Sequence, residues 1–217
     1  MSRGRFITFE GTEGGGKSTQ IQLLAERLRA GGFPVRTLRE PGGTPVGEEI
    51  RHLLKHSEAN RAMTPEAELL LICASRAQLV REVIRPALAA GETVLCDRFY
   101  DSTIAYQGYG RQLNLDLVRA VIDFAVRETR PDLTLLLHVP LKVSEARRAA
   151  RAGNAPALRD RFEEADRAFF QRVEDGYLRI ARAEPHRVKV IDATPGVETV
   201  AQVVWRVAAA ALRAPGA

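Results

Sequence analysis

Residues 9–19, FEGTEGGGKST, decide the fold, because they join an apolar run to a helical pattern. Gly11, Gly16, Lys17 and Ser18 fit the phosphate-loop pattern G-x-x-x-x-G-K-[ST]. In such a loop the glycines let successive backbone N–H groups face phosphate oxygens, lysine reaches the terminal phosphates, and serine holds Mg²⁺. The stretch predicts a nucleoside triphosphate site, with a plain glycine-rich turn as the alternative. The residues expected to bind nucleotide are Gly11, Thr12, Glu13, Gly14, Gly15, Gly16, Lys17, Ser18 and Thr19.

The chain on either side of this loop predicts an α/β fold. A short β-type run precedes the loop, and apolar residues recur at helical spacing after Lys17. Similar apolar runs follow turn residues further along, and helical patterns separate them. The five expected core strands are residues 5–10, 35–38, 92–97, 132–139 and 187–192. Continuously apolar strands that alternate with helices indicate a five-stranded parallel sheet with helices on both faces.

Helix signals and chain length add a long helix and a single domain to this prediction. Thr64 is suited to cap a long, mostly apolar helix over residues 64–84, with Pro65 at its first position. A length of 217 residues favours one domain, residues 1–217. The loosest segment, residues 151–160, interrupts one helical pattern before another begins.

The composition limits the kinds of partner that the protein is expected to bind. No apolar run approaches the ~20 residues of a membrane span, and the N-terminal run is too short for a signal peptide, so we expect a cytoplasmic protein without a membrane partner. The net charge of +5 comes from arginines and lysines spread along the chain without a nucleic-acid module. Small phosphates are therefore the expected partners, and nucleic acid is not. Cys73 and Cys96 have no metal-ligand spacing and are expected to be buried hydrophobes.

The end of the third strand offers a magnesium ligand. Asp97 ends this strand with Arg98 beside it, and a carboxylate here would complete a Mg²⁺ site with Ser18. The alternative is a strand-end turn. The sequence has no N-K-x-D element for guanine, which argues against a GTP-dependent switch, and no catalytic loop of the protein kinases. An acceptor that is already a phosphate monoester needs positive charge more than a base, which suits Lys17, Arg39 and Arg98.

Five stretches together resemble a known family. They are FEGTEGGGKSTQ, then REPGGT at 39–44, ASRAQLV at 74–80, DRFYDSTIAYQGYGR at 97–111 and DRFE at 160–163. In this order they resemble the thymidylate kinases, in the bacterial branch whose lid supplies an arginine. The resemblance implies ATP + dTMP giving ADP + dTDP with Mg²⁺, on a P-loop nucleoside monophosphate kinase fold that is usually a homodimer. A rival kinase for another monophosphate or a deoxynucleoside, and a binding module without transfer, stay open.

The resemblance assigns roles to single residues. Arg39 and Arg98 would hold the acceptor phosphate, Arg76 would donate to thymine O4, and Glu13 would accept from the 3′-hydroxyl of the deoxyribose. Thr103, Tyr106 and Gln107 would line the thymidine pocket, and their i, i+3, i+4 spacing also puts them on one helix face. Without the resemblance, Tyr106 reads as a core aromatic and Arg76 as a buried ion-pair partner or a snorkelling side chain.

Three departures from the family pattern affect the site. Ile72 stands where relatives place a stacking Phe, which leaves the preference between dTMP and dUMP open. His138 replaces a common Asp, and a hydrogen-bonded structural histidine is expected there. Gly14 stands where one branch has an arginine, so the missing cation must come from the lid.

The lid is expected to be mobile and to span about residues 144–164. Arg151 is the first candidate for the arginine that reaches the transferred phosphate, and Arg161 is the second. Arg147 and Arg148 read as solvated charges of a helix face. Topology places residues 191–196 near adenine, and the apolar helix at 66–74 is a candidate dimer face.

Overall fold

The sheet of the computed structural model has five parallel strands in the order β2-β3-β1-β4-β5. The structure describes residues 3–152 and 166–213. The strands are β1 (Phe6–Glu10), β2 (Val35–Arg39), β3 (Thr93–Asp97), β4 (Leu133–His138) and β5 (Val188–Asp192). All five strands predicted from the sequence are thus confirmed, within a residue or two at their ends. β1 is buried along its whole length because neighbouring strands and helices cover it, whereas the edge strand β2 is partly exposed.

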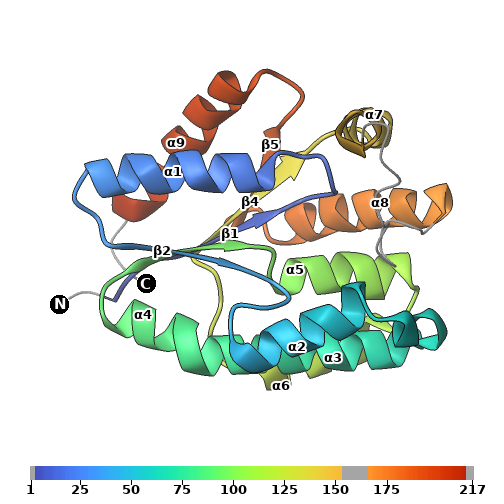
Figure 1. The fold of residues 1–217 in the computed structure, drawn as a ribbon. Helices are drawn as coiled ribbons and strands as arrows, with labels where there is room; N and C mark the ends of the chain where they lie inside the picture. Colours follow the sequence, from blue (N-terminus) through green and yellow to red (C-terminus); the bar gives the residue numbers. More distant parts are fainter. Residues whose placement is uncertain (1–2, 153–165, 214–217) are drawn as a thin grey trace.

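Helices cover both faces of this sheet (Figure 1). On one face α1 (Lys17–Ala30) and α9 (Val197–Arg213) pack together against β1, β4 and β5. The other face carries five further helices, in a second core cluster. They are α3 (Pro65–Leu79), α4 (Arg85–Ala89), α5 (Tyr100–Thr103), α6 (Leu115–Val126) and α8 (Arg167–Ala183). The predicted α/β class with a doubly covered parallel sheet is therefore confirmed.

Two helical segments depart from the expected regular α-helix. The predicted helix at 64–84 begins as expected, since Thr64 Oγ1 accepts from Ala67 N at 3.2 Å, but its last residues Val80–Ile84 form a π-turn that leads into α4. The helix after β3 is also only briefly α-helical, because Ile104–Gly110 form a π-helix. Such wide turns cannot be distinguished from α-helix by apolar spacing, and they are often found at functional sites.

The π-helix at Ile104–Gly110 packs very tightly against α8. A Cβ atom on Gly176 would lie 2.6 Å from the Tyr109 ring, and one on Gly110 would lie 2.6 Å from the Phe169 ring. Only glycine fits where an aromatic ring lies this close to the backbone. These two glycines therefore lock α8 to the segment that carries Tyr106 and Gln107.

The remaining elements lie around the ends of the strands. They are α2 (Pro45–Lys55), the 3₁₀ turn Glu58–Ala62 and α7 (Leu141–Ala152). Because all strands are parallel, their carboxyl ends meet at one edge of the sheet, where order reverses at β1 between β3 and β4. The phosphate loop follows β1 at this switch point. The central part of the predicted lid, 153–165, lies outside the described residues.

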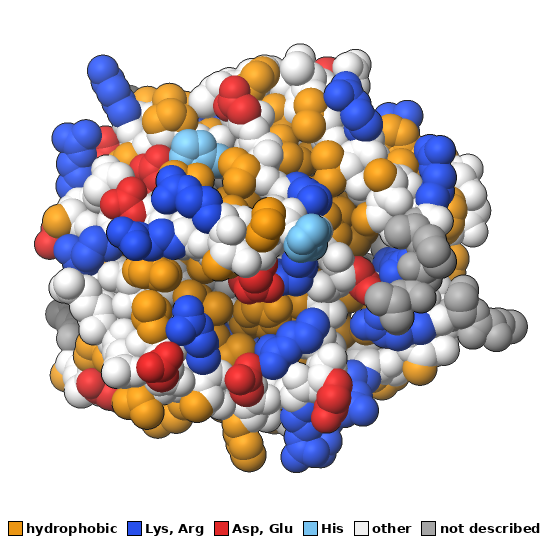
Figure 2. All heavy atoms as spheres, turned by 180° about the vertical axis from the view of Figure 1, so that it is seen from behind, with side chains coloured by type: hydrophobic (Ala, Val, Ile, Leu, Met, Phe, Trp, Pro, Cys, Tyr) orange, Lys and Arg blue, Asp and Glu red, His pale blue; other side chains and the backbone are white. Residues whose placement is uncertain are grey.

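On the face seen in Figure 2, lysine and arginine side chains are scattered among acidic and apolar ones. No helix of the described chain is long and apolar enough to cross a membrane. Cys73 and Cys96 are buried and unpaired, as the sequence predicted.

Candidate active site

The loop between β1 and α1 has the backbone that phosphate binding requires. Gly11 has φ +129°, and a Cβ there would collide with the Leu137 carbonyl; Gly16 has φ +84° and caps α1. The loop therefore ends with the first N–H groups of α1 unpaired by capping side chains, which favours an anion. Lys17 is buried, and its Nζ donates to the carbonyls of Gly11 and Thr12 at 3.1 Å each. Burial, followed by the nearby charge of Arg98, lowers the pKa of Lys17.

A cavity of about 670 Å³ opens at the carboxyl ends of the strands. It joins the phosphate loop to α3, to the segment after β3 and to the loop after β5. Most of the site residues predicted from the sequence line it, whereas Gly11 and Thr12 do not. The predicted residues on its wall are Glu13, Gly14, Gly15, Gly16, Lys17, Ser18, Thr19, Arg39, Ile72, Arg76, Asp97, Arg98, Thr103, Tyr106 and Gln107.

Ser18 and Asp97 form the predicted hydroxyl and carboxylate pair. Ser18 Oγ donates to Asp97 Oδ2 at 3.0 Å, which brings the start of α1 to the end of β3. The other carboxylate oxygen, Oδ1, is buried and accepts no hydrogen bond from the described chain. Hydroxyl and carboxylate oxygens are ligands that Mg²⁺ prefers, so this pair fits a magnesium ion beside the phosphate loop.

Arg98 connects the phosphate loop to the pocket. Its φ of +68° turns the chain sharply after β3, and its Nη2 lies 2.6 Å from Glu13 Oε1. Nη1 donates to Ser102 Oγ at 3.0 Å and to Tyr177 Oη at 3.1 Å. The Arg98 guanidinium, followed by Lys17, holds the pKa of Glu13 far below its usual range, so this carboxylate is ionised.

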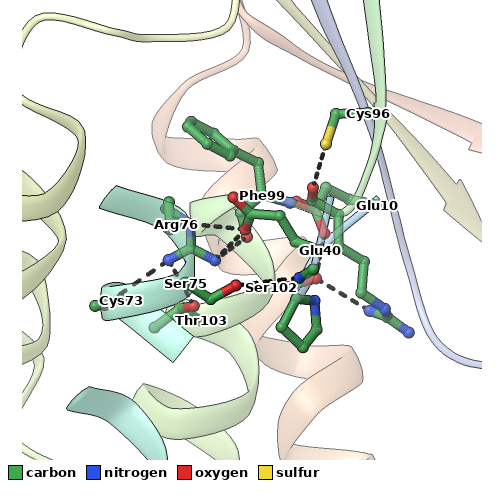
Figure 3. Close-up of polar contacts among 12 residues, drawn as sticks. Glu10, Glu40, Cys73, Ser75, Arg76, Cys96, Phe99, Ser102 and Thr103 are labelled. Atoms are coloured by element: carbon green, nitrogen blue, oxygen red, sulfur yellow. Dashed lines mark hydrogen bonds and ion pairs between the residues drawn. The ribbon is translucent and has the colours of Figure 1, made fainter. Parts of the chain in front are cut away.

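Glu10 supports the cavity wall through Ser102, and the sequence did not reveal this role. It ends β1 fully buried and accepts from Phe99 N at 2.8 Å, Ser102 Oγ at 2.6 Å and Tyr177 Oη at 3.0 Å. Burial and the nearby Asp101 raise the pKa of Glu10 to about 7. A charged residue that ends a mostly apolar strand was the available signal. Figure 3 shows Glu10 beside Phe99 and Ser102.

Arg76 lies in a dense buried network (Figure 3). Its Nε donates to Glu40 Oε2 at 2.7 Å, Nη1 to Thr103 Oγ1 at 3.0 Å, and Nη2 to the Phe99 carbonyl at 3.1 Å. Nη1 also contacts Cys73 Sγ at 3.8 Å. The buried ion pair that the sequence left as an alternative is thus present. A base oxygen could replace the contact with sulfur, because thiol sulfur is a weak acceptor.

The predicted thymidine-pocket residues gather on one wall although their helix is partly π rather than α. Thr103 and Gln107 are each 1 % exposed, Tyr106 is 6 % exposed and Ile72 is 8 % exposed, and all four reach the cavity. Tyr106 packs edge-on against the rings of Phe169 and Tyr177 while its hydroxyl lies 3.4 Å from Arg98 Nη2. Tyr106 is therefore both a core aromatic and a residue of the cavity wall.

Three cations at the mouth of the cavity differ from the sequence expectations. Arg147 was expected to be a solvated charge, and this is wrong: it donates to the carbonyls of Gly14 at 3.3 Å, Ala193 at 2.9 Å and Thr194 at 3.1 Å. Arg51 and Lys55 were missed, although their i, i+4 spacing on α2 was a signal. Predicted Arg39 is nearly half exposed and donates to Glu48 Oε2 at 3.0 Å.

Other predicted positions have simpler outcomes. His138 Nε2 lies 2.9 Å from Glu174 Oε1, so the expected structural histidine is confirmed. Arg161 lies outside the described residues, and so does the side chain of Arg151. The side chain of Arg148 is likewise not described.

Three comparisons with known proteins agree. A model of the thymidylate kinase family matches residues 9–204. The chain is 51 % identical to the thymidylate kinase of Geobacter sulfurreducens over 202 residues, which cover 93 % of this chain and 94 % of the relative. It is 50 % identical to the enzyme of Alcanivorax borkumensis, over 94 % and 95 % of the two chains. The crystal structure of the Ehrlichia chaffeensis thymidylate kinase superposes with a TM-score of 0.77 at 34 % identity, over 95 % and 99 % of the chains.

Proposed function

The chain belongs to the thymidylate kinase family, and we propose that it transfers the terminal phosphoryl group of ATP, in the presence of Mg²⁺, to dTMP. The enzyme phosphorylates dTMP to dTDP. One observation supports the detailed proposal most strongly: a single cavity joins the phosphate loop to a wall made by Arg98, Thr103 and Gln107. Donor and acceptor can therefore lie in one cavity, as direct transfer between them requires.

The donor end is assigned to the loop and its neighbours. Lys17 and the N–H groups at the start of α1 would bind the phosphates of ATP. Ser18 and Asp97 would hold Mg²⁺, whose charge offsets that of the phosphates. Arg147 bridges the phosphate loop and the loop after β5, so we assign residues 193–197 and Arg147 to the adenine end.

The acceptor end needs cations and positioning rather than a base. A phosphate monoester has a second pKa of about 6 and is already ionised at neutral pH. Arg39 and Arg98 would hold it, with Arg51 and Lys55 adding positive charge from α2. Glu13 would accept from the 3′-hydroxyl while it pairs with Arg98, which faces it at 2.6 Å.

The pyrimidine would lie against Ile72, Arg76, Thr103 and Gln107, with Tyr106 at the sugar. Arg76 would donate to thymine O4, giving up its weak contact with Cys73. Because Gly14 carries no side chain, a cation from the lid at about 144–164 would complete the site, with Arg151 first and Arg161 second.

Two further statements extend this proposal. We propose that residues 1–217 fold as one domain and form a homodimer through α3 and α6. These helices pack side by side and carry the exposed apolar side chains Leu70, Leu117 and Phe124. Large apolar side chains exposed together often mark an interface. A cytoplasmic location stays a prediction of the sequence.

The test is ADP release from ATP with dTMP, dUMP, UMP, AMP and thymidine assayed in parallel. A signal that depends on dTMP and Mg²⁺ supports the proposal, and Lys17→Met should abolish it because that side chain reaches the phosphates. A signal with thymidine alone would identify a deoxynucleoside kinase instead. Release that ignores every acceptor would favour a nucleotide-binding module that does not transfer phosphate.

A further inference from the structure

Gln107 is held in one orientation by a buried carboxylate outside the cavity. Its Nε2 donates to Glu68 Oε1 at 2.8 Å, from the π-helix to α3. Glu68 is fully buried, and Arg111 donates to both of its oxygens, from Nε at 3.2 Å and from Nη2 at 3.0 Å. The Arg111 guanidinium in turn stacks over the Phe169 ring with its centre 4.8 Å away. Phe169 therefore helps to hold Arg111, Arg111 holds Glu68, and Glu68 holds the amide of Gln107.

The orientation follows from chemistry and does not depend on how the amide is drawn. A carboxylate paired with arginine only accepts hydrogen bonds, so the group that Gln107 turns toward Glu68 must be its NH₂. The carbonyl oxygen then lies on the opposite side of the amide. Among the described residues it accepts no hydrogen bond, and Gln107 lines the cavity.

An acceptor in this position distinguishes the pyrimidines. Thymine and uracil carry a hydrogen on N3 beside the O4 acceptor, whereas cytosine has an acceptor at N3 beside a 4-amino donor. A wall that offers a carbonyl from Gln107 and donors from Arg76 matches the first pattern and opposes the second. Sites built to hydrogen-bond a substrate reject analogues that leave those groups unpaired.

We propose that Glu68, held by Arg111, is a positioning residue that fixes the Gln107 carbonyl toward the base, so that the pocket selects pyrimidines with a hydrogen on N3. This inference rests on the proposed function, because it places the base of the acceptor at this wall. Glu68 acts through Gln107 and does not touch the substrate. The 5-methyl group of thymine is not read by this device.

The experiment measures dissociation constants of dTMP, dUMP and dCMP for the full chain by calorimetry. In Glu68→Gln the new amide can donate its own NH₂ to Gln107. The Gln107 amide can then flip, which turns its NH₂ instead of its carbonyl toward the cavity. The preference for dTMP over dCMP should fall about fivefold to tenfold, the effect of one hydrogen bond. The dTMP to dUMP ratio should not change, because both bases carry the N3 hydrogen. Glu66→Gln is the matched control, an exposed acid on the same helix.

A double-mutant cycle separates positioning from a merely structural tie between α3 and the π-helix. Gln107→Met removes the amide, so adding Glu68→Gln in that background should leave the dTMP to dCMP ratio where it was. An equal effect of Glu68→Gln with and without Gln107 overturns the proposal. So does an unchanged ratio in the single variant.

A measurement on the wild-type protein covers the case in which Glu68→Gln does not fold. The side-chain NH₂ protons of Gln107 should show nuclear Overhauser contacts to the Glu68 methylene protons with dTMP bound. Contacts of these protons to the thymine ring instead overturn the orientation. Failure of the proposed function is distinct, because the wild type would then release no ADP in response to dTMP.

Discussion

Arg98 Nη2 lies 2.6 Å from Glu13 Oε1, so the acid of the phosphate loop faces the cation expected to hold the acceptor phosphate. An acid inside an anion-binding loop is thus balanced by an arginine from the end of β3. The remaining acceptor capacity of Glu13 is available to a sugar hydroxyl, since a carboxylate has about four lone-pair sites.

Glu13→Gln should reduce the discrimination between dTMP and 3′-deoxythymidine monophosphate. The neutral amide is a weaker acceptor for the 3′-hydroxyl and a weaker partner for Arg98, so kcat/KM for dTMP should fall more than kcat/KM for the analogue. Steady-state kinetics with both substrates measure this, and Glu26→Gln on the exposed side of α1 is the control. A wild-type ratio in Glu13→Gln would show that the 3′-hydroxyl is read elsewhere.

Ile72→Phe should lower KM for dTMP. Ile72 is a buried aliphatic residue on the cavity wall, and an aromatic ring there can stack on thymine, worth roughly 1 kcal/mol or about fivefold in affinity. The matched control is Ile72→Leu, which keeps an aliphatic contact. An unchanged or higher KM for the phenylalanine variant would remove the base from this position.

Arg151→Ala should lower kcat far more than KM. An arginine that reaches the transferred phosphate acts in the transition state, and such a residue can be worth on the order of 10³-fold. Single-turnover kinetics on Arg151→Ala and Arg161→Ala should show the larger loss in the first variant. A nearly normal kcat in Arg151→Ala would move the role to Arg159 or Arg161.

Glu10 should make the free energy of unfolding depend on pH. Its pKa rises from 4.5 to about 7 on folding, so between these values the native protein holds a proton that the unfolded chain has lost. The contribution of Glu10 is therefore full below pH 4.5 and declines as the pH rises toward 7. The side chain in Glu10→Gln cannot ionise. The free energy of unfolding of the wild type minus that of this variant should therefore be largest at pH 5 and smallest at pH 8.

Urea denaturation at four pH values from 5 to 8 measures this difference. Glu66→Gln should follow the wild type, because its side chain is exposed. A difference between wild type and Glu10→Gln that stays constant with pH would show that Glu10 does not carry the titrating proton.

Phe124→Ser should weaken the proposed dimer. This side chain is 80 % exposed on α6, which packs beside α3, where Leu70 is 58 % exposed. Removing the ring should shift sedimentation equilibrium toward monomer at micromolar concentration. Phe33→Ser is the control, a 45 % exposed ring beyond the end of α1. Equal masses for wild type and Phe124→Ser would locate the contact elsewhere or show a monomer.

Much of the fold could be predicted because its signals are local. The apolar run of β1, the loop glycines and Lys17 lie within twelve consecutive residues, 6–17, and the Asp97 prediction needed only the end of one more strand. The pairing of Ser18 with Asp97 across 79 residues then followed from parallel topology.

The rest of the site depends on packing between distant segments. Glu10 meets Tyr177 across 167 residues, and Arg147 reaches the Gly14 carbonyl across 133. Neither hydrophobic periodicity nor a motif indicates contacts between residues so far apart in the sequence. Arg147 therefore resembled any other arginine on a helix face. The buried partners of Arg76 and Gln107 were hidden for the same reason, since Glu40 and Glu68 become neighbours only when the chain is folded.

The glycine contacts between α8 and the π-helix join α8 rigidly to the cavity wall that carries Tyr106 and Gln107. Tyr109 lies against Gly176, and Phe169 against Gly110, without room for a methyl group. The predicted thymidine wall is thereby anchored to α8 from within the folded core. For protein engineering, we expect that substitutions in the predicted lid leave the shape of this wall unchanged, because the glycine contacts that hold it lie within the described residues.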